Sequence, residues 1–205
     1  MKQSDSPIIK EDYKLWEDLK KGDKSALSFI YFQNFQSMFN YGMKLKYDSD
    51  FVKDCIQEVF FQLIKKRDKL GQTDNIKLYL LKSVKNRIIR ELSSKNKESL
   101  NKKKLPQFES VFSVEDEFIQ KEGNTKKETA LFQAITKLSE RQREAIFLKY
   151  ECDLSYSEIC ELMNISNDSA RKLVYRAVTR IKQIIHKNTG PGFVLFLTSL
   201  RKYVL

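Results

Sequence analysis

The sequence predicts an all-α protein in which a flexible linker joins two small helical domains. Only 6 Gly and 3 Pro occur in 205 residues, which is too few turn-forming residues for a β-sandwich or β-barrel. Hydrophobic residues make up 41% and charged residues 32% of the chain, a balance typical of globular proteins. Apolar periodicity is dense in two zones and weak in the polar stretch between them, which contains the run KNKESLNKKK. We therefore expect a first domain, a linker, a second domain and an apolar tail at 1–94, 95–127, 128–188 and 189–205.

We expect four helices in the first domain, over about 11–21, 23–46, 50–64 and 75–94. Gly22 can end the first helix, because glycine readily takes the left-handed conformation found after a helix C-terminus. Asp23 and Asp50 can cap the second and third helices, because an aspartate oxygen accepts a hydrogen bond from a free N–H of the first turn. In the third and fourth helices, i, i+3, i+4 spacing of apolar residues predicts one buried stripe each. The residues of these stripes are Val52, Ile56, Val59, Phe60, Leu63 and Ile64, and then Ile76, Leu80, Leu81, Val84, Ile88 and Leu92.

The second domain is also expected to contain four helices, and the last two have the dimensions of a helix-turn-helix. The first covers about 128–138. Residues 139–142 and 155–158 each match a capping box, with serine at the N-cap and Gln or Glu three residues later. Asn164 falls in the turn, and asparagine tolerates the left-handed conformation better than most non-glycine residues. A long helix follows over about 167–186.

This long helix carries the first functional signal. Once the apolar face that begins at Ala170 is buried, Arg171, Lys172 and Tyr175 must point outward. They lie in the first turns, which a recognition helix presents to base edges in the major groove. No acidic residue follows Asp168, so the remainder of the helix is cationic. A helical hairpin with a solvated basic face is the alternative interpretation.

The fourth helix of the first domain carries a second basic face, opposite its apolar stripe. The chain as a whole has 38 Lys+Arg against 27 Asp+Glu, a formal charge of +11, which indicates nucleic acid first and an anionic membrane second as a partner. Cations bind phosphates, and an aromatic or an amide can stack on or hydrogen-bond to unpaired bases. A solvated charge run is the alternative. The residues of this face are Tyr79, Lys82, Lys85, Asn86 and Arg90.

The third helix carries a surface of the opposite character. Asp54, Gln57 and Glu58 share the face away from the buried stripe, and Phe61 continues it. An acidic and polar strip beside an aromatic side chain suits a protein partner better than DNA. Taken alone, this face is better explained as a merely solvated one.

Other classes of site and location find little support in the sequence. Three cysteines without a CxxC motif and a single histidine, His186, predict no zinc site. The chain lacks a Gly-rich phosphate loop and a nucleophile–base pair, so we expect no enzymatic activity, no cofactor and no small-molecule substrate. The N-terminus lacks the apolar core of a signal peptide, and the longest apolar run, 193–197, is far too short to span a bilayer. We expect a reduced, soluble, cytoplasmic protein without stable membrane insertion.

The three surfaces, in this order, resemble those of the extracytoplasmic-function type of sigma factor, the small bacterial RNA polymerase specificity subunits. The resemblance spans about residues 24–185. No one of the strings that carry it is decisive, but all five occur in the family's order and with its spacing. They are DCIQEVF at 54–60, YL at 79–80 followed by VKN at 84–86, LSERQR at 138–143, SEICEL at 157–162 and ARKLVYRA at 170–177. Within this family, the chain is similar to the iron- and polysaccharide-uptake regulators common in Bacteroidetes.

The resemblance implies a role for each surface, together with core RNA polymerase, promoter DNA and an anti-sigma protein as partners. It implies that residues of the third helix dock on the polymerase clamp helices: Asp54, Gln57, Glu58 and Phe61. It implies that residues of the fourth helix meet the minus-ten element: Tyr79, Lys82, Lys85, Asn86 and Arg90. The loop 71–74 matches the segment that receives a flipped-out base, and the linker would thread toward the RNA exit path. Residues of the long helix would read the minus-thirty-five element: Asn167, Arg171, Lys172, Tyr175 and Arg176.

Two other classes of protein remain open. A ligand-responsive helix-turn-helix repressor would need an apolar cavity in the first domain and would act as a dimer on a palindrome. An adaptor whose basic face binds RNA or a membrane is the second. The apolar tail can pack on its own domain or dock a partner such as a membrane-tethered anti-sigma protein. Binding to core polymerase discriminates among the three classes.

Overall fold

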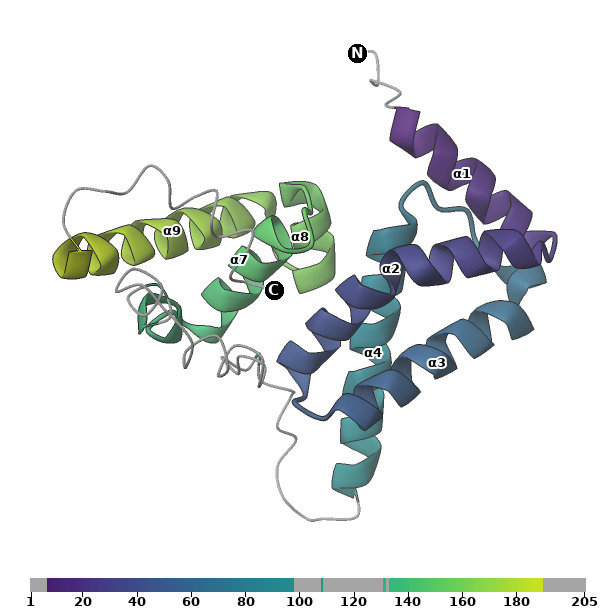
Figure 1. The fold of residues 1–205 in the computed structure, drawn as a ribbon, viewed down its shortest axis with the longest axis horizontal. Helices are drawn as coiled ribbons and strands as arrows, with labels where there is room; N and C mark the ends of the chain where they lie inside the picture. The colour runs from purple at the N-terminus through teal and green to yellow at the C-terminus, as the bar shows by residue number, and fades with distance from the viewer. Residues whose placement is uncertain (1–6, 98–107, 109–130, 132, 190–205) are drawn as a thin grey trace. The chain divides into compact units, whose positions relative to one another are not determined.

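A computed structural model shows two compact helical units, Met1–Pro106 and Gln107–Leu205 (Figure 1). All regular secondary structure in the described part of the chain is helical, which confirms the prediction of an all-α protein with two helical domains. Most of the predicted linker and nearly all of the predicted apolar tail lie outside the described residues. The described residues are 7–97, 108, 131 and 133–189.

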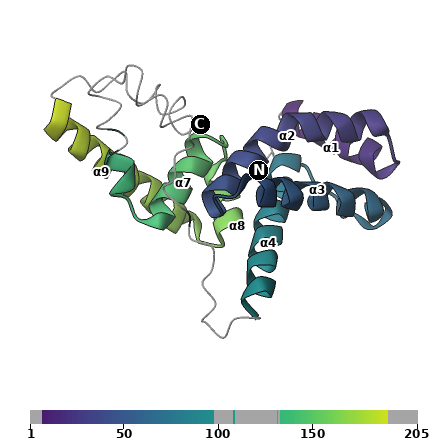
Figure 2. The same ribbon diagram turned by 60° about the horizontal axis from the view of Figure 1, so that its bottom comes forward.

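The first unit is built around three long helices that contact one another. Helix α2 packs against α1, α3 and α4, and α3 also packs against α4 (Figures 1 and 2). The elements are α1 (Pro7–Lys20), α2 (Lys24–Leu45), α3 (Ser49–Lys65), the short 3-10 helix η1 (Arg67–Lys69) and α4 (Ile76–Lys97). The completely buried side chains at the centre include Trp16, Ile30, Met38, Tyr41, Ile56, Leu80, Leu81 and Ile88.

The predicted end of α1 and the predicted cap of α2 are confirmed, but α1 begins at Pro7, four residues before its predicted start. Gly22 has a φ of +89° directly after α1, and the Asp23 side chain accepts a hydrogen bond from Ser25 N at 2.7 Å to cap α2. The predicted cap of α3 is wrong. Asp48, not Asp50, accepts the hydrogen bond from Phe51 N at 3.1 Å, because the helix begins earlier, at Ser49, and leaves Asp50 in its first turn.

The buried stripes of α3 and α4 are largely as predicted, with one clear exception. Ile64 is 46% exposed, because it lies in the last turn of α3, where Leu63 already takes the inward position. At the other end of α3, Gly42 of α2 approaches so closely that a Cβ there would lie 2.6 Å from Val52 Cγ1. Glycine is needed at this crossing for its lack of a side chain.

The second unit contains α7 (Glu140–Tyr150), α8 (Tyr156–Met163) and α9 (Asn167–Thr189). Both predicted capping boxes are present, at Ser139 and Ser155. Asn164 has φ 52° and ψ 56°, so the left-handed turn of the helix-turn-helix is also confirmed. Helix α9 packs on both α7 and α8. The predicted helix over 128–138 is seen in part, as helical residues at 131 and 133–136.

Phe108 belongs to the packing of the second unit although it lies within the predicted linker. It is 3% exposed, and its ring meets Phe147 edge-on with the centroids 5.7 Å apart. Its N–H donates to Glu140 Oε1 at 2.6 Å, and its carbonyl accepts from Arg143 Nη2 at 3.2 Å. A single aromatic residue in a polar stretch has no periodic pattern, so the sequence did not indicate this contact.

Among the described residues, no helix has both the length and the apolar character that a membrane crossing requires.

Candidate nucleic-acid interface

Helix α9 presents the cationic face that the sequence predicts. Ala170, Val174 and Ala177 are buried, which turns the intervening residues outward. Tyr175, at 72%, is one of the most exposed large side chains. All five candidate residues of the minus-thirty-five set are exposed: Asn167, Arg171, Lys172, Tyr175 and Arg176.

Arg171 is held in place by neighbours on both helices of the helix-turn-helix. Its Nε donates to Asn167 Oδ1 at 2.8 Å, and its guanidinium carbon lies 5.3 Å from the centroid of the Tyr156 ring on α8. Lys149 Nζ lies at the same distance from that ring. Tyr156 was not among the predicted site residues, because the capping box around it explains its position without any binding role.

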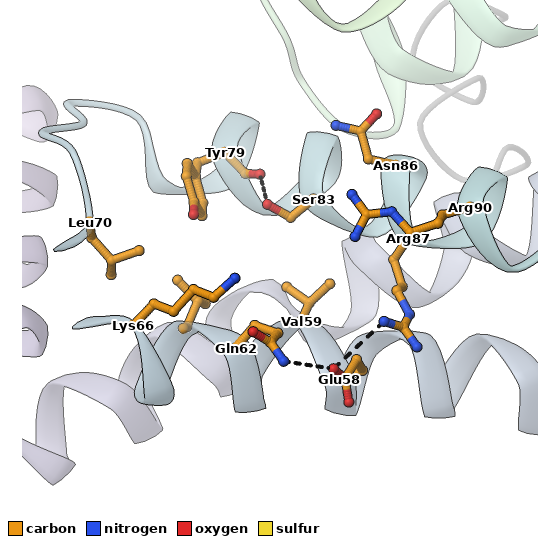
Figure 3. Close-up of a pocket in the computed structure, with 11 residues that line it drawn as sticks. Glu58, Val59, Gln62, Lys66, Leu70, Tyr79, Ser83, Asn86, Arg87 and Arg90 are labelled. Atoms are coloured by element: carbon orange, nitrogen blue, oxygen red, sulfur yellow. Dashed lines mark hydrogen bonds and ion pairs between the residues drawn. The ribbon is translucent and has the colours of Figure 1, made fainter. Parts of the chain in front are cut away.

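The first unit contains a cleft of about 480 Å³ between α3 and α4 (Figure 3). The cleft is open to solvent, and most of the residues that line it are polar or charged. Leu70, from the loop between the two helices, contributes to its lining. The remaining residues come from α3 and its C-terminal cap, and from α4: Glu58, Val59, Gln62, Leu63 and Lys66, and Tyr79, Ser83, Asn86, Arg87 and Arg90.

The Tyr79 ring packs against a buried tryptophan. Its ring meets Trp16 of α1 edge-on, with centroids 4.9 Å apart. Trp16 is completely buried, and its Nε1 donates to the carbonyl of Gly71 at 2.8 Å. One tryptophan thus fixes both the aromatic wall of the cleft and the start of the predicted base-receiving loop, a role the sequence did not indicate.

The predicted minus-ten residues divide into two groups. Tyr79, Asn86 and Arg90 line the cleft, and the last two are exposed. Lys82 and Lys85 lie on α4 outside the cleft and are half-buried. The cleft therefore collects the aromatic, the amide and one cation of the set.

Glu58 was expected to share the exposed face of Asp54 and Gln57, but it is only partly exposed. Its side chain is 32% exposed, with Oε1 3.6 Å from Arg87 Nη1, and it accepts a hydrogen bond from Gln62 Nε2 at 2.9 Å (Figure 3). The physical reason is its position directly before the buried Val59, at the edge of the apolar stripe that faces α4. Asp54 and Gln57 are exposed as expected.

The remaining residue of this strip, Phe61, is 54% exposed, and Lys65 Nζ lies 5.9 Å from its ring centroid. An exposed aromatic side chain next to Asp54 and Gln57 fits the expected protein-binding character of this face. The strip therefore keeps three of its four residues on the outside of α3.

Two carboxylates of α1 connect that helix to α4 and to the preceding loop. Asp12 Oδ2 accepts a hydrogen bond from Ile76 N at 3.0 Å and so caps α4. Burial raises the pKa of Asp12, although this hydrogen bond opposes the change. Hydrogen bonds from Lys20 and from Gln72 of the loop lower the pKa of Glu17.

Comparison with known families decides what these two units are. The family model described as Sigma-70 region 2 matches residues 14–98, and that described as Sigma-70, region 4 matches residues 128–181. Together the two matches cover well over half of the chain. The chain belongs to the sigma-70 family. It is a sigma factor of the extracytoplasmic-function type, with regions 2 and 4, and it directs promoter recognition by RNA polymerase.

Membership of this family also settles the class of activity. Sigma factors are transcription initiation factors and not enzymes, as the sequence predicts for this chain. The region 2 match contains α2, α3 and the cleft, and the region 4 match contains the helix-turn-helix with the exposed cations of α9.

Two solved structures show that the fold is shared. The sigma factor is similar to CnrH in its complex with the cytosolic domain of CnrY, with 15% identity over 87% of this chain and 99% of that chain, and a TM-score of 0.60. It is also similar to the sigma factor RpoE of Bartonella quintana in complex with the anti-sigma factor NepR. There the identity is 17% over 76% of this chain and 93% of that chain, with a TM-score of 0.53. A comparison with curated proteins finds no match.

Proposed function

We propose that the two units of this sigma factor divide the work of promoter recognition. The first unit docks on core polymerase and holds an unpaired base of the minus-ten element in the cleft between α3 and α4. The second reads the duplex of the minus-thirty-five element with α9. The observation that carries this proposal is the cleft itself, because it combines a supported aromatic ring with amides and cations.

The cleft has the size and chemistry that an unpaired base requires. Its volume of about 480 Å³ lies within the usual range for small-molecule sites, about 300–1,000 Å³. Tyr79 offers a ring on which a base can stack, an interaction worth about 1–3 kcal/mol per base. Asn86 and Ser83 offer polar atoms for base edges, and Arg90 offers a cation for the backbone. Such contacts offset the few kcal/mol that unstacking a base costs.

Helix α9 has the arrangement that a recognition helix requires. Arg171 lies in the second turn, where it can reach a guanine, and a bidentate contact of this kind discriminates by about 1–3 kcal/mol against a wrong base. Lys172, Tyr175 and Arg176 are exposed beside it and can contact bases or phosphates. Asn167 holds the Arg171 side chain through the 2.8 Å hydrogen bond, so it acts as a positioning residue as well as a candidate DNA contact.

Docking on polymerase is assigned to the strip of Asp54, Gln57, Glu58 and Phe61. The exposed members offer a carboxylate, an amide and an aromatic ring to a protein surface. Glu58 contributes from the edge of the strip, where it also reaches the cleft. Lys82 and Lys85 are proposed as cations for the minus-ten DNA outside the cleft.

We further propose an anti-sigma partner, a cytoplasmic location and a subgroup for this chain. Both solved relatives are complexes, one with the cytosolic domain of CnrY and one with the anti-sigma factor NepR, which supports an anti-sigma protein as a partner of this chain. Action on polymerase implies a cytoplasmic location. The motif strings support membership of the Bacteroidetes uptake-regulator subgroup. The proposed domain limits are 1–94 and 128–188, and Phe108 of the linker packs against the second domain.

Transcription with purified components tests the proposal. The chain should direct core polymerase to start from discrete sites on supercoiled DNA, and mapping the RNA 5′ ends should give a shared upstream motif. A ligand-responsive repressor would instead bind operator DNA without polymerase, as a dimer. The polar lining of the cleft argues against that alternative, since a sensor site for an apolar ligand needs an apolar cavity.

A further inference from the structure

Arg87, which lines the cleft from α4, is held by two carboxylates, one of which, Glu58, also lines the cleft. Its Nη1 lies 3.6 Å from Glu58 Oε1 of α3, and its Nη2 lies 2.5 Å from Glu91 Oε1, one turn along α4. The side chains of Arg87, Glu58 and Glu91 are 30%, 32% and 30% exposed. At this exposure water screens the pairs, so a competing ion can replace either partner at modest cost.

This cluster changes what the cleft offers to nucleic acid. One guanidinium and two carboxylates sum to a net charge of −1, so this cluster offsets part of the positive charge that Lys66 and Arg90 bring to the cleft. The guanidinium is also not fully satisfied, because Arg87 Nε is buried and has no hydrogen-bond partner among the described residues. Withdrawing one carboxylate would leave the cluster neutral and make a guanidinium N–H of Arg87 available to another acceptor.

Glu58 is placed to be withdrawn by the other proposed partner. It lies on α3 between the exposed Asp54 and Phe61, and it also lines the cleft. We infer that Glu58 and Arg87 form an exchangeable ion pair, in which a polymerase cation that takes Glu58 frees Arg87 to bind a DNA phosphate in the cleft. This inference rests on the proposed docking role of Glu58. Because such coupling is reciprocal, DNA in the cleft should also strengthen polymerase binding by the same factor.

Replacing one carboxylate by its amide tests the exchange in the isolated full-length chain. Glu58→Gln keeps the shape of the side chain and a hydrogen-bonding oxygen for Gln62, but removes the charge that holds Arg87. Binding to a short dye-labelled single-stranded DNA of mixed sequence should tighten by about two- to fivefold, the effect of one exposed ion pair. The slope of log affinity against log salt should steepen by about 0.7, as for one added phosphate contact.

Asp50→Asn is the matched control. It removes the same charge from the same helix at a side chain that is 95% exposed and pairs with Lys53, so it changes the net charge without releasing Arg87. The gain from Glu58→Gln should exceed the gain from this control, and it should disappear in the double variant Glu58→Gln/Arg87→Gln. Equal gains in the two single variants, or a gain that persists without Arg87, would overturn the exchange.

The polymerase complex supplies the second arm. There Glu58→Gln should bind core polymerase more weakly, yet once assembled it should bind the same DNA as tightly as the unaltered complex does, because residue 58 no longer pairs with Arg87 in either complex. Unchanged affinity for core polymerase would overturn the docking role of Glu58 and with it the coupling. If Glu58→Gln weakens binding to core polymerase but the isolated variant does not bind DNA more tightly, the exchange is overturned while the docking role of Glu58 stands.

Discussion

The two units of this sigma factor hold their candidate binding residues in opposite ways. In the second unit, the cations of α9 lie on the outside of the core, and Arg171 contacts Asn167 and Tyr156. In the first unit the candidates are tied across helices, as in the edge-on contact of Tyr79 with Trp16. Exposed side chains on a packed core can be substituted without loss of stability. Side chains that form contacts between helices cannot. Substitutions should therefore separate binding from stability in the second unit and change both in the first.

The largest expected effect is on the core of the second unit. Phe108→Ala removes a buried ring, which in protein cores costs about 3–5 kcal/mol. Far-ultraviolet circular dichroism should show the second unit melting earlier. The fluorescence of Trp16, which lies in the first unit and is the only tryptophan, should report an unchanged transition there. Base preference at the upstream element should not change at temperatures where the unit is folded. An unaltered melting curve would show that Phe108 does not belong to this core.

Tyr79→Ala should lower both stability and function. The edge-on contact with Trp16 contributes about 0.5–1.5 kcal/mol beyond burial, so with the lost apolar area we expect about 2 kcal/mol of destabilisation. Promoter-directed initiation should fall as well, because the stacking platform is gone. Tyr79→Phe is the control, since it keeps the ring, and it should retain most of both properties. Full activity in the Tyr79→Ala variant would contradict the assignment of the cleft.

Arg171→Ala should change binding and leave stability alone. The free energy of binding to the preferred upstream element should become less favourable by about 1–3 kcal/mol, and the base preference at one position should relax. Arg180→Ala, about two and a half turns farther along α9 at another exposed position, should weaken binding to all DNA similarly. If Arg171→Ala also lowers affinity equally on every sequence in a competition assay, Arg171 is a phosphate contact and the groove assignment is wrong.

The smallest effect concerns Asp12, which ties α1 to α4. Burial raises the pKa of this carboxyl from its usual value of 3.8, so the folded state holds its proton more tightly than the unfolded chain does. The free energy of unfolding therefore gains a contribution that declines as pH rises from about 4 through the raised pKa. Asp12→Asn should remove that slope in urea unfolding measured from about pH 4 to pH 7, and Asp12→Ala should cost about 1 kcal/mol by removing the helix cap. An unchanged slope in Asp12→Asn would assign the pH dependence to other groups.

Local rules predict much of this fold, and long-range contacts account for what they miss. The capping boxes at Ser139 and Ser155 and the left-handed turn at Asn164 depend on a few adjacent residues, so they can be recognised in the sequence. The exposed face of α9 follows from helical periodicity alone.

The features that escaped prediction join residues far apart in the chain. Trp16 holds Gly71, and Phe108 packs against Phe147, with no pattern in the sequence to pair them. Glu58 was expected to be exposed, but whether a residue at the edge of a stripe meets solvent or a neighbouring helix depends on how that helix crosses. The candidate site was accordingly predictable as a set of exposed residues on α9 and only in part as a cleft.

Initiation from a fully paired promoter, compared with the same promoter carrying a mismatched, pre-opened minus-ten region, tests the division of work most directly. Opening the DNA in advance should reduce the defect of Tyr79→Ala, because part of that defect lies in trapping bases as the strands separate. It should leave the defect of Arg171→Ala unchanged, because that side chain acts on duplex upstream. If the two defects respond equally to the pre-opened template, the two units do not divide promoter recognition in this way.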